Sequence, residues 1–492
     1  MFRDARLGVV LDLTDGPELG QDGVDAAFTA MAALEGGAVA NADEQRQVGH
    51  YWLRTPELAP SGDVRAAITD AWARLDTDLA PADWDTVLVV GIGGSALGPQ
   101  FVDHALHTSA DPRRLVCLDN TDAEGISRKL AAIDPARTVV VVVSKSGGTT
   151  ETRNGMLATM QVFEAAGVPF AEHAIAVTGP GSKLDRLARS AGAPWRAVFP
   201  IFDWVGGRTS VTGPVGLVPM ALCGWDWRGF LAGARDMDAC TRVAEVARNP
   251  AMQLALAWHA AGNGRGDRAL VMLPYRDRFA LLGRYLQQLV MESIGKRLDR
   301  AGSRVDQGLT VYGNKGSTDQ HAYVQQVRDG RDDTFTHFID TRERGPRITV
   351  DHGLDVDDHL VGFLLGTQAA LRERGRPSVH IQVADASAQS VGQLVALFER
   401  AVGFYAELIH INAYHQPGVE AGKRGAKVAL AALGALQAAL TEAPRSAREL
   451  APDGVDARLA WRLLQQLAAT GRARCVETGA SPLDDRFARA SS

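Results

Sequence analysis

Residues Asp85 to Gly98, which read DTVLVVGIGGSALG, join an apolar run directly to a glycine-rich loop. Residues Thr138 to Thr152, TVVVVVSKSGGTTET, repeat this order with a loop rich in hydroxyl groups. Each stretch is typical of a strand, an anion-binding loop and a helix start. Unpaired N–H groups at a helix N-terminus attract an anion, and glycine lets the backbone approach it. The two stretches therefore predict an α/β fold that holds a phosphate group.

Apolar runs alternate with helical patterns on both sides of these stretches. Strands are expected at 87–90, 115–118, 139–143 and 174–178, and a second series at 268–273, 334–339 and 378–383. Such alternation predicts parallel sheets that are covered on both faces. We expect two doubly wound parallel-sheet domains, each a sandwich of helix, sheet and helix layers.

The remaining segments are Ala- and Leu-rich with helical spacing. The end of the chain is predicted to form a small helical module with a wing, used for packing or dimerisation rather than for DNA binding. The expected domains are a helical N-terminal arm (1–80), a first α/β domain (81–225), a second α/β domain (226–440) and a helical tail (441–492).

Composition restricts the class of protein. The chain has 492 residues, of which 46% are hydrophobic and 22% charged, as in a globular protein of more than one domain. A formal charge of −6 argues against a nucleic-acid binder. The four cysteines are scattered without disulfide or zinc spacing, which favours the cytoplasm. We expect no secretory signal and no membrane span, because no apolar run reaches roughly 20 residues.

The two loops have alternative interpretations. The first satisfies a G-x-G-x-x-A dinucleotide pattern, with Asp119 near the end of the next strand, but this signal is weak. The purely structural alternative is a tight strand–helix turn in which glycine allows close packing. For the loop from Ser144 to Thr152, helix capping explains one or two hydroxyl groups and leaves the others unexplained.

Glu292 lies on a helical stretch that is apolar around nearly its whole circumference. Glu292 and Lys296 have the spacing of a surface ion pair, which is worth only about 0.2 to 0.5 kcal/mol. The apolar residues around them indicate a buried helix instead, and a carboxylate in a buried helix needs a reason. Gln288 shares its face one turn earlier and could hydrogen-bond a ligand.

Three further residues follow glycine-containing turns. Arg208 could enter a cleft and stabilise negative charge, and the imidazole of His321 suits proton transfer at neutral pH. Taken alone, Arg208, His321 and Lys423 are each more often surface residues. Their order along the chain favours a functional interpretation.

Together these motifs resemble the glucose-6-phosphate isomerase, or phosphoglucose isomerase, family. The resemblance extends from about Gly91 to Lys423 in the order of the family. It rests on the motifs GIGGS (91–95), SKSGGTTET (144–152), GGR (206–208), MESIGK (291–296), GSTDQH (316–321) and QPGVEAGK (416–423).

The resemblance implies two sugar-isomerase-type domains and an aldose–ketose isomerase of glycolysis and gluconeogenesis that needs no metal or organic cofactor. Glu292 would move a proton between carbons 2 and 1, Arg208 would hold the enediolate, and His321 with Lys423 would open the sugar ring. A homodimer is implied, with His321 supplied by the neighbouring subunit. The implied substrate-binding residues are Gly94, Ser95, Ser144, Lys145, Ser146, Thr149, Thr152, Gln288 and Gln416.

Three positions depart from the family pattern, namely Gly147-Gly148, Asp319 and Pro417. They affect the expected phosphate contacts and the loop near Lys423, not the reactive side chains. Two alternatives stay open at this point. An NAD-dependent dehydrogenase would use the first glycine loop, and a non-catalytic sugar-phosphate sensor would use the same fold without turnover.

Overall fold

The computed structural model describes residues 1–79 and 83–490. The chain divides into two compact units, Met1–His415 and Gln416–Ser492. The first unit, called unit 1 here, contains both large sheets. The second, unit 2, begins with a long helix.

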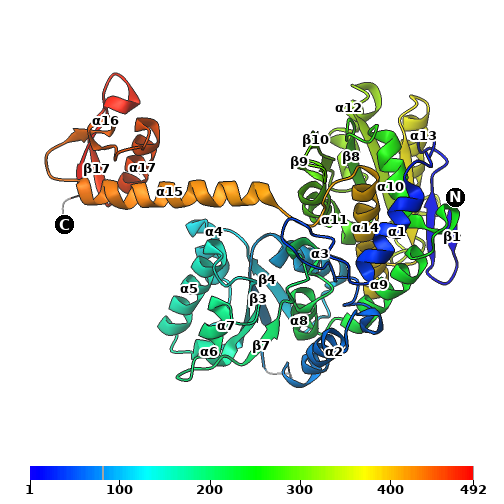
Figure 1. Cartoon of the computed structure of the whole chain (residues 1–492), viewed down its shortest axis with the longest axis horizontal. Helices are drawn as coiled ribbons and strands as arrows, with labels where there is room; N and C mark the ends of the chain where they lie inside the picture. Colours follow the sequence, from blue (N-terminus) through cyan, green and yellow to red (C-terminus); the bar gives the residue numbers. More distant parts are fainter. Residues whose placement is uncertain (80–82, 491–492) are drawn as a thin grey trace. The chain divides into compact units, whose positions relative to one another are not determined.

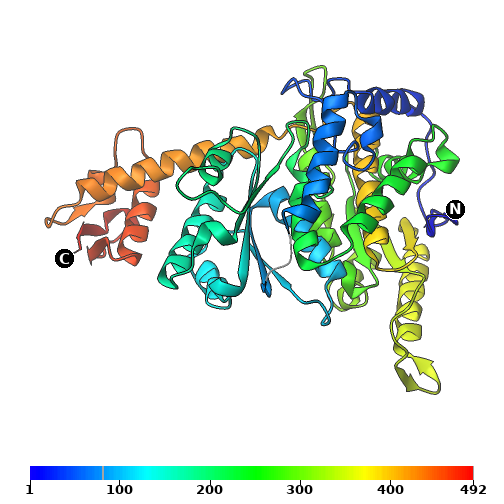
Figure 2. The same ribbon diagram turned by 90° about the horizontal axis from the view of Figure 1, so that it is seen from below.

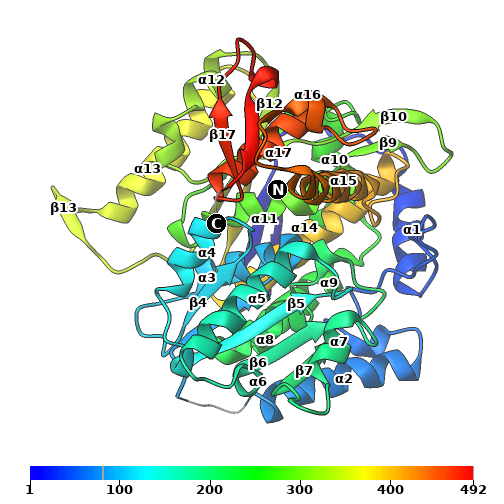
Figure 3. The same cartoon turned by 90° about the vertical axis from the view of Figure 1, so that its left-hand side faces the viewer.

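The first sheet of unit 1 is wholly parallel, in the order β4-β3-β5-β6-β7. Every residue of the strands Thr86–Val90 and Thr138–Ser144 is buried, because helices cover both faces (Figure 3). Successive side chains of a strand point to opposite faces of the sheet, so they pack against different helix layers. Val87, Val89 and Val141 pack with the large central core, whereas Leu88 and Val140 pack with α5 and α7. The strands are β3 (Thr86–Val90), β4 (Arg114–Leu118), β5 (Thr138–Ser144), β6 (Ala174–Thr178) and β7 (Ala197–Pro200).

This strand order places the two predicted loops beside each other. The chain passes from β3 to its neighbour β4 on one side and then to β5 on the other. Ligands of doubly wound sheets bind beyond the carboxyl ends of the strands where the order switches. The loops after β3 and β5 are the two glycine-rich loops, so the fold brings them to one edge.

Helices connect and cover these strands. Their bounds are α1 (Val24–Glu35), α2 (Gly62–Thr77), α3 (Leu97–Leu106), α4 (Ala123–Leu130), α5 (Thr150–Ala165), α6 (Phe170–His173), α7 (Lys183–Ala188) and α8 (Pro214–Cys223). Short 3-10 turns are η1 (Pro56–Leu58), η2 (Gly93–Ser95), η3 (Pro135–Arg137) and η4 (Gly207–Thr209).

The second sheet is only partly parallel. Its order is β1-β2-β15-β12-β8-β11, and β2 and β1 run antiparallel to their neighbours, so this sheet is mixed rather than wholly parallel. The N-terminal arm contains the helices α1 and α2, and it also supplies these two edge strands. They are too short to show a periodic pattern, and their pairing with β15 joins distant parts of the chain. The strands are β1 (Phe2–Asp4), β2 (Val9–Asp12), β8 (Ala269–Pro274), β11 (Val311–Tyr312), β12 (Thr334–Thr341) and β15 (Ser378–Val383).

Helix α14 is buried along most of its length because it packs against α9, α10 and α1. In Figure 2, α13 and the β13–β14 hairpin, drawn in yellow, reach away from the rest of unit 1. The elements here are α9 (Trp227–Thr241), η5 (Val246–Arg248), α10 (Pro250–Ala261), η6 (Asp277–Phe279), α11 (Leu282–Leu286), η7 (Gln287–Glu292), β9 (Lys296–Leu298), β10 (Arg304–Gln307), η8 (Thr318–His321), α12 (Val324–Asp329), β13 (Thr349–Asp351), β14 (Leu354–Asp355), α13 (Val356–Arg372) and α14 (Ala388–Leu408).

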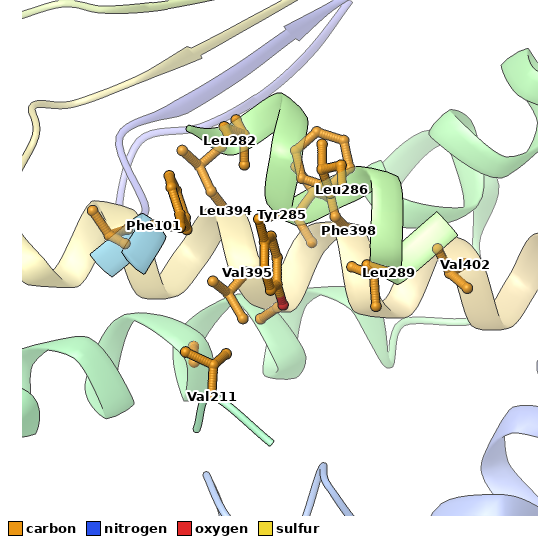
Figure 4. Packing of buried hydrophobic residues seen from close by; sticks show 14 of the residues in the cluster. Phe101, Val211, Leu282, Tyr285, Leu286, Leu289, Leu394, Val395, Phe398 and Val402 are labelled. Carbon is orange, nitrogen blue, oxygen red and sulfur yellow. The ribbon is translucent and has the colours of Figure 1, made fainter. Parts of the chain in front are cut away.

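The helical stretch α11–η7 is anchored on α14 and α3 (Figure 4). Tyr285 stacks on Phe101 with ring centroids 5.5 Å apart, and its hydroxyl donates to Glu399 at 3.4 Å. Burial of each large apolar side chain contributes about 1.5 to 3 kcal/mol. The packing of Tyr285 and its apolar neighbours therefore holds α11–η7, which carries Glu292, in place. The buried residues at the contact between α11–η7 and α14 are Leu282, Tyr285, Leu286, Leu289, Leu394, Val395, Phe398 and Val402.

Unit 2 consists of a long helix with a small domain at its C-terminal end (Figure 1). Leu436, Leu464 and Phe487 are fully buried in its own core. The small domain combines α16 and α17 with a three-stranded sheet in the order β16-β18-β17. The elements are α15 (Pro417–Ala439), β16 (Arg445–Ser446), α16 (Ala447–Leu450), α17 (Ala457–Ala469), β17 (Ala473–Glu477), η9 (Pro482–Asp484) and β18 (Arg486–Arg489).

The prediction of an α/β chain with parallel strands is confirmed. The domain boundaries at residues 80, 225 and 440 remain proposals. Across residues 1–79 and 83–490, no helix is both long enough and apolar enough to cross a membrane.

Candidate active site

Glycines bring three chain segments of unit 1 together beyond the end of β3. A side-chain carbon on Gly94 would lie 2.1 Å from the carbonyl oxygen of Gly207, so only glycine permits this approach. Gly93 has φ +59°, and a side-chain carbon there would lie 3.1 Å from Nε2 of Gln288. The glycine loop with Ser95 therefore sits against both the Arg208 turn and the helix of Gln288.

Gln288 and Glu292 both lie on η7, which is a π-helix over Gln287–Glu292. Such wide turns are rare and often occur at functional sites. The helix is buried on one side, where Leu289 and Val290 are at most 1% exposed, whereas Met291 is 40% exposed. The expectation of burial around nearly the whole circumference is therefore only partly met. The sequence pattern did not distinguish a π-helix from an α-helix.

Glu292 faces Arg208 rather than Lys296. Arg208 Nη1 lies 3.4 Å from Glu292 Oε2, and the two side chains are 5% and 19% exposed. Oε2 accepts no hydrogen bond within the described residues. This carboxylate oxygen is buried and lies beside the guanidinium with which it pairs.

The guanidinium of Arg208 is fixed from several directions. Nε donates to Ser293 Oγ at 2.6 Å, and Nη2 donates to the carbonyls of Ala413 and, at 3.2 Å, His415. Burial lowers the pKa of Arg208 from its usual value, and the carboxylate of Glu292 opposes this shift. A fixed guanidinium in a dry site stabilises negative charge that develops on a substrate.

The loop after β5 holds its own hydroxyl groups in place. The amides of Gly147 and Gly148 each donate at 3.1 Å, to the hydroxyls of Ser144 and Ser146 respectively, and Ser144 Oγ donates to Thr149 Oγ1 at 3.2 Å. Thr149 is the N-cap residue of α5, yet its side chain makes no capping hydrogen bond. Capping therefore does not account for these hydroxyls.

A cavity of about 280 Å³ lies beside this loop and is lined by Ser144, Thr149 and Thr152. Thr152 is 4% exposed, and its hydroxyl has no hydrogen-bond partner among the residues described. Arg153 and Lys183 also line the cavity. Apolar residues line it as well, namely Val142, Met156, Leu184 and Leu187. The hydroxyl donors and the positive charge at the start of α5 suit an anion.

Lys145 connects this loop to the segment that precedes Arg208. Its Nζ donates to the carbonyls of Asp203 at 2.7 Å and Val205 at 3.0 Å. Burial lowers the pKa of Lys145, while Asp203 opposes the shift. The lysine thus joins the hydroxyl loop to the Arg208 turn.

His321 lies exposed at the end of η8. No hydrogen bond or ion pair within the described part of the chain joins its ring to Glu292 or Arg208. Asp319 organises this loop, since its carboxylate accepts from the amides of Asn314 and Lys315 at 2.7 and 3.1 Å and from the Tyr323 hydroxyl at 2.5 Å. The departure from the family pattern at Asp319 thus has a structural role.

Gln416 and Lys423 belong to unit 2, where both are exposed at the N-terminal end of α15. Their roles remain predictions. Sequence reasoning missed the contributions of Ser293 and Lys296. Both were visible inside the MESIGK motif, but no pattern could show that the lysine points back onto the helix.

Comparison with known proteins identifies the family. The chain matches the phosphoglucose isomerase family over residues 23–354 and 367–443. A glucose-6-phosphate isomerase from a Synechococcus species is 53% identical over 421 residues, which cover 82% of this chain and 79% of that protein. A glucose-6-phosphate isomerase from Geobacter sulfurreducens is 49% identical, covering 98% of this chain and 96% of that protein.

A solved structure supports the same assignment. The crystal structure of a glucose-6-phosphate isomerase from Chlamydia trachomatis has a TM-score of 0.78 and 26% sequence identity with this chain. The match covers 86% of this chain and 88% of that one. The chain therefore belongs to the phosphoglucose isomerase family.

Proposed function

We propose that this chain interconverts D-glucose 6-phosphate and D-fructose 6-phosphate. Membership of the family makes it an aldose–ketose isomerase. The observation that carries the proposal is the Glu292 carboxylate, which has an oxygen without a hydrogen bond within the described residues and lies 3.4 Å from the buried Arg208. A base and an anion-stabilising group in contact are what proton transfer next to a carbonyl requires.

The reaction needs no net oxidation. Glu292 takes the proton from carbon 2 of the open-chain aldose, and the electron pair left behind forms the enediolate. Arg208 stabilises the negative charge on the enediolate oxygen. The hydroxyl proton on oxygen 2 passes to oxygen 1, and Glu292 returns its proton to carbon 1, which yields the ketose.

The phosphate group is proposed to bind at the loop after β5. Ser144, Ser146, Thr149 and Thr152 would donate hydroxyl groups, with the amides at the start of α5. Lys145 would add positive charge nearby. Gly94, Ser95, Gln288 and Gln416 are proposed to line the sugar end.

His321 and Lys423 are proposed to open the sugar ring, with His321 acting in a neighbouring subunit of a homodimer. The exposed position of His321 on η8 supports this. Gln320 donates to the carbonyl of Phe363 on α13 at 3.1 Å, so the histidine loop and α13 belong to one surface. That surface carries apolar side chains between 46% and 57% exposed, which a second subunit would cover; they are Ile348, Val350, Leu354, Val356, Phe363 and Leu365.

The proposed location is the cytoplasm. All four cysteines are free, and Cys117, Cys223 and Cys240 are buried. Unpaired cysteines are typical of a reducing compartment.

The test is conversion of fructose 6-phosphate by the purified chain, followed with a coupling dehydrogenase specific for glucose 6-phosphate. We expect steady formation of glucose 6-phosphate. Reduction of NAD without the coupling enzyme would indicate the dehydrogenase instead. Binding of fructose 6-phosphate without conversion would indicate a sensor. The family match supports neither of these alternatives.

A further inference from the structure

Lys296 is buried where the helix of Glu292 ends. It is 4% exposed, and its Nζ donates to the main-chain carbonyls of Glu292 and Ser293, both at 2.7 Å. The chain enters β9 at this point, so no further helical turn follows to supply amide donors. The ammonium group takes the place of those amides.

The two carbonyls belong to Glu292 and to Ser293, the residue that binds Arg208. Ser293 Oγ accepts from Arg208 Nε at 2.6 Å, and Arg208 in turn lies 3.4 Å from the Glu292 carboxylate. Lys296, Ser293, Arg208 and Glu292 are therefore linked in a closed set of contacts. Without the ammonium group, the carbonyls of Glu292 and Ser293 would both lose the hydrogen bonds that Lys296 donates.

Charged groups from several elements face Lys296. Arg208 and Glu292 act on it from η4 and η7, and Asp43 and His415 act from the loops after α1 and α14. Burial and the charge of Arg208 lower the pKa of Lys296 to about 7, against the opposing effect of Glu292 and Asp43. A cation here favours negative charge on the intermediate.

We propose that Lys296 is a positioning residue for the isomerase reaction, whose ammonium group holds Glu292 and Arg208 in the geometry of proton transfer. This inference rests on the proposed function. Lys296 acts through the backbone of Glu292 and through Ser293. It lies on a different element from the hydroxyl loop, so binding of the phosphate group does not depend on it.

The experiment compares Lys296→Met and Lys296→Arg with the wild type, using fructose 6-phosphate. Methionine keeps the length of the side chain and removes its donors and charge. We expect kcat to fall on the order of 100-fold, because a small misplacement of a reacting group has effects of this size, while KM stays within about threefold. Arginine retains charge and donors and should restore part of kcat.

Lys129→Met is the matched control. Its ammonium also donates to a main-chain carbonyl, that of Cys117, but on β4 and away from Glu292 and Arg208. We expect this variant to keep both kcat and KM. Circular dichroism and the thermal midpoint of each variant measure the folded fraction.

The pH profile of kcat/KM separates positioning from a merely structural role. Guanidinium keeps its proton at all accessible pH values, so Lys296→Arg should move the alkaline limb of the profile to higher pH. A structural role would lower the folded fraction and leave the shape of the profile unchanged.

Unchanged kcat in folded Lys296→Met would overturn the inference, as would a loss that only follows the unfolded fraction. If Lys296→Met does not fold, an unshifted profile in Lys296→Arg would overturn it. Absence of isomerase activity in the wild type would instead overturn the proposed function, and this inference with it.

Discussion

Glu292 and Arg208 show how the fold creates chemistry at the scale of single residues. A carboxylate and a guanidinium at the surface would form a weak, screened pair. Here Arg208 is 5% exposed and tied to Ser293, so its charge acts in a largely dry environment. The carboxylate retains one oxygen with no hydrogen bond within the described residues.

Glu292→Gln tests the base. The amide cannot accept the proton, so we expect kcat to fall roughly 10²- to 10⁴-fold, the usual contribution of a general base. KM for fructose 6-phosphate should stay within a few fold, because the hydroxyl loop is unchanged. Glu245→Gln, at an exposed carboxylate paired with Arg248, is the control. Near-normal turnover in Glu292→Gln would contradict the assignment.

At the scale of elements, close backbone contact positions the site. The turn η2 lies against η4, and Gly94 leaves no room for a side-chain carbon beside the carbonyl of Gly207. The turn that presents Arg208 is therefore fixed by the glycine loop that follows β3.

Gly94→Ala should lower both activity and stability. The added carbon would lie 2.1 Å from backbone, so η2 and η4 must separate, which would displace Arg208. We expect at least a tenfold loss of kcat and a lower thermal midpoint. Gly62→Ala, where a side-chain carbon meets nothing within 4 Å, is the control. Equal behaviour of the two variants would show that this contact does not position the site.

His337 predicts a pH dependence of stability that originates in β12. Burial lowers its pKa to about 3, and Trp258 donates to its Nε2 at 3.3 Å. Above pH 6.5 both folded and unfolded states hold the ring neutral. Below pH 6.5 the imidazole of His337 binds a proton in the unfolded state, whereas in the folded state it does so only near pH 3. The free energy of unfolding therefore falls as pH falls.

His337→Gln removes this titration. Between pH 7.5 and pH 5.5 the free energy of unfolding should fall less in the variant than in the wild type, by about 1.4 kcal/mol. Urea unfolding at the two pH values measures the difference. His50, whose pKa burial also lowers, is present in both proteins and cancels. An identical pH dependence in wild type and variant would count against the prediction.

These elements also show what the sequence could predict. The strands β6 and β15 are predicted at their observed residues, because β6 is a continuous apolar run and β15 alternates apolar with polar residues. The strands β1 and β2 were missed because they are short and depend on pairing with β15. Local patterns could indicate Glu292 and Arg208 as candidates. Their contact, the π-helix beneath them and the inward turn of Lys296 depend on tertiary packing.

At the scale of the whole molecule, the ring-opening histidine is proposed to act in a second copy of the chain. His321 is exposed, and its loop is joined to the apolar face of α13 through Gln320. A closed dimer with twofold symmetry would cover this face on both subunits equally.

Mixing Glu292→Gln chains with His321→Ala chains tests the shared site. Each hybrid dimer would combine an intact Glu292 with an intact His321 from the partner at one site. Random exchange of equal amounts should therefore restore about a quarter of wild-type activity, since half of the dimers are hybrids with one complete site of two. No recovery, despite hybrids verified by mass spectrometry, would contradict sharing.

The central claim is that Glu292 carries a proton between neighbouring carbons of the sugar. The most direct measurement follows fructose 6-phosphate in deuterium oxide by NMR, with wild type and Glu292→Gln. We predict that the wild type forms glucose 6-phosphate with deuterium at carbon 2, and that the variant forms neither product nor label at a comparable rate. Label or product formed equally fast by the variant would contradict the account.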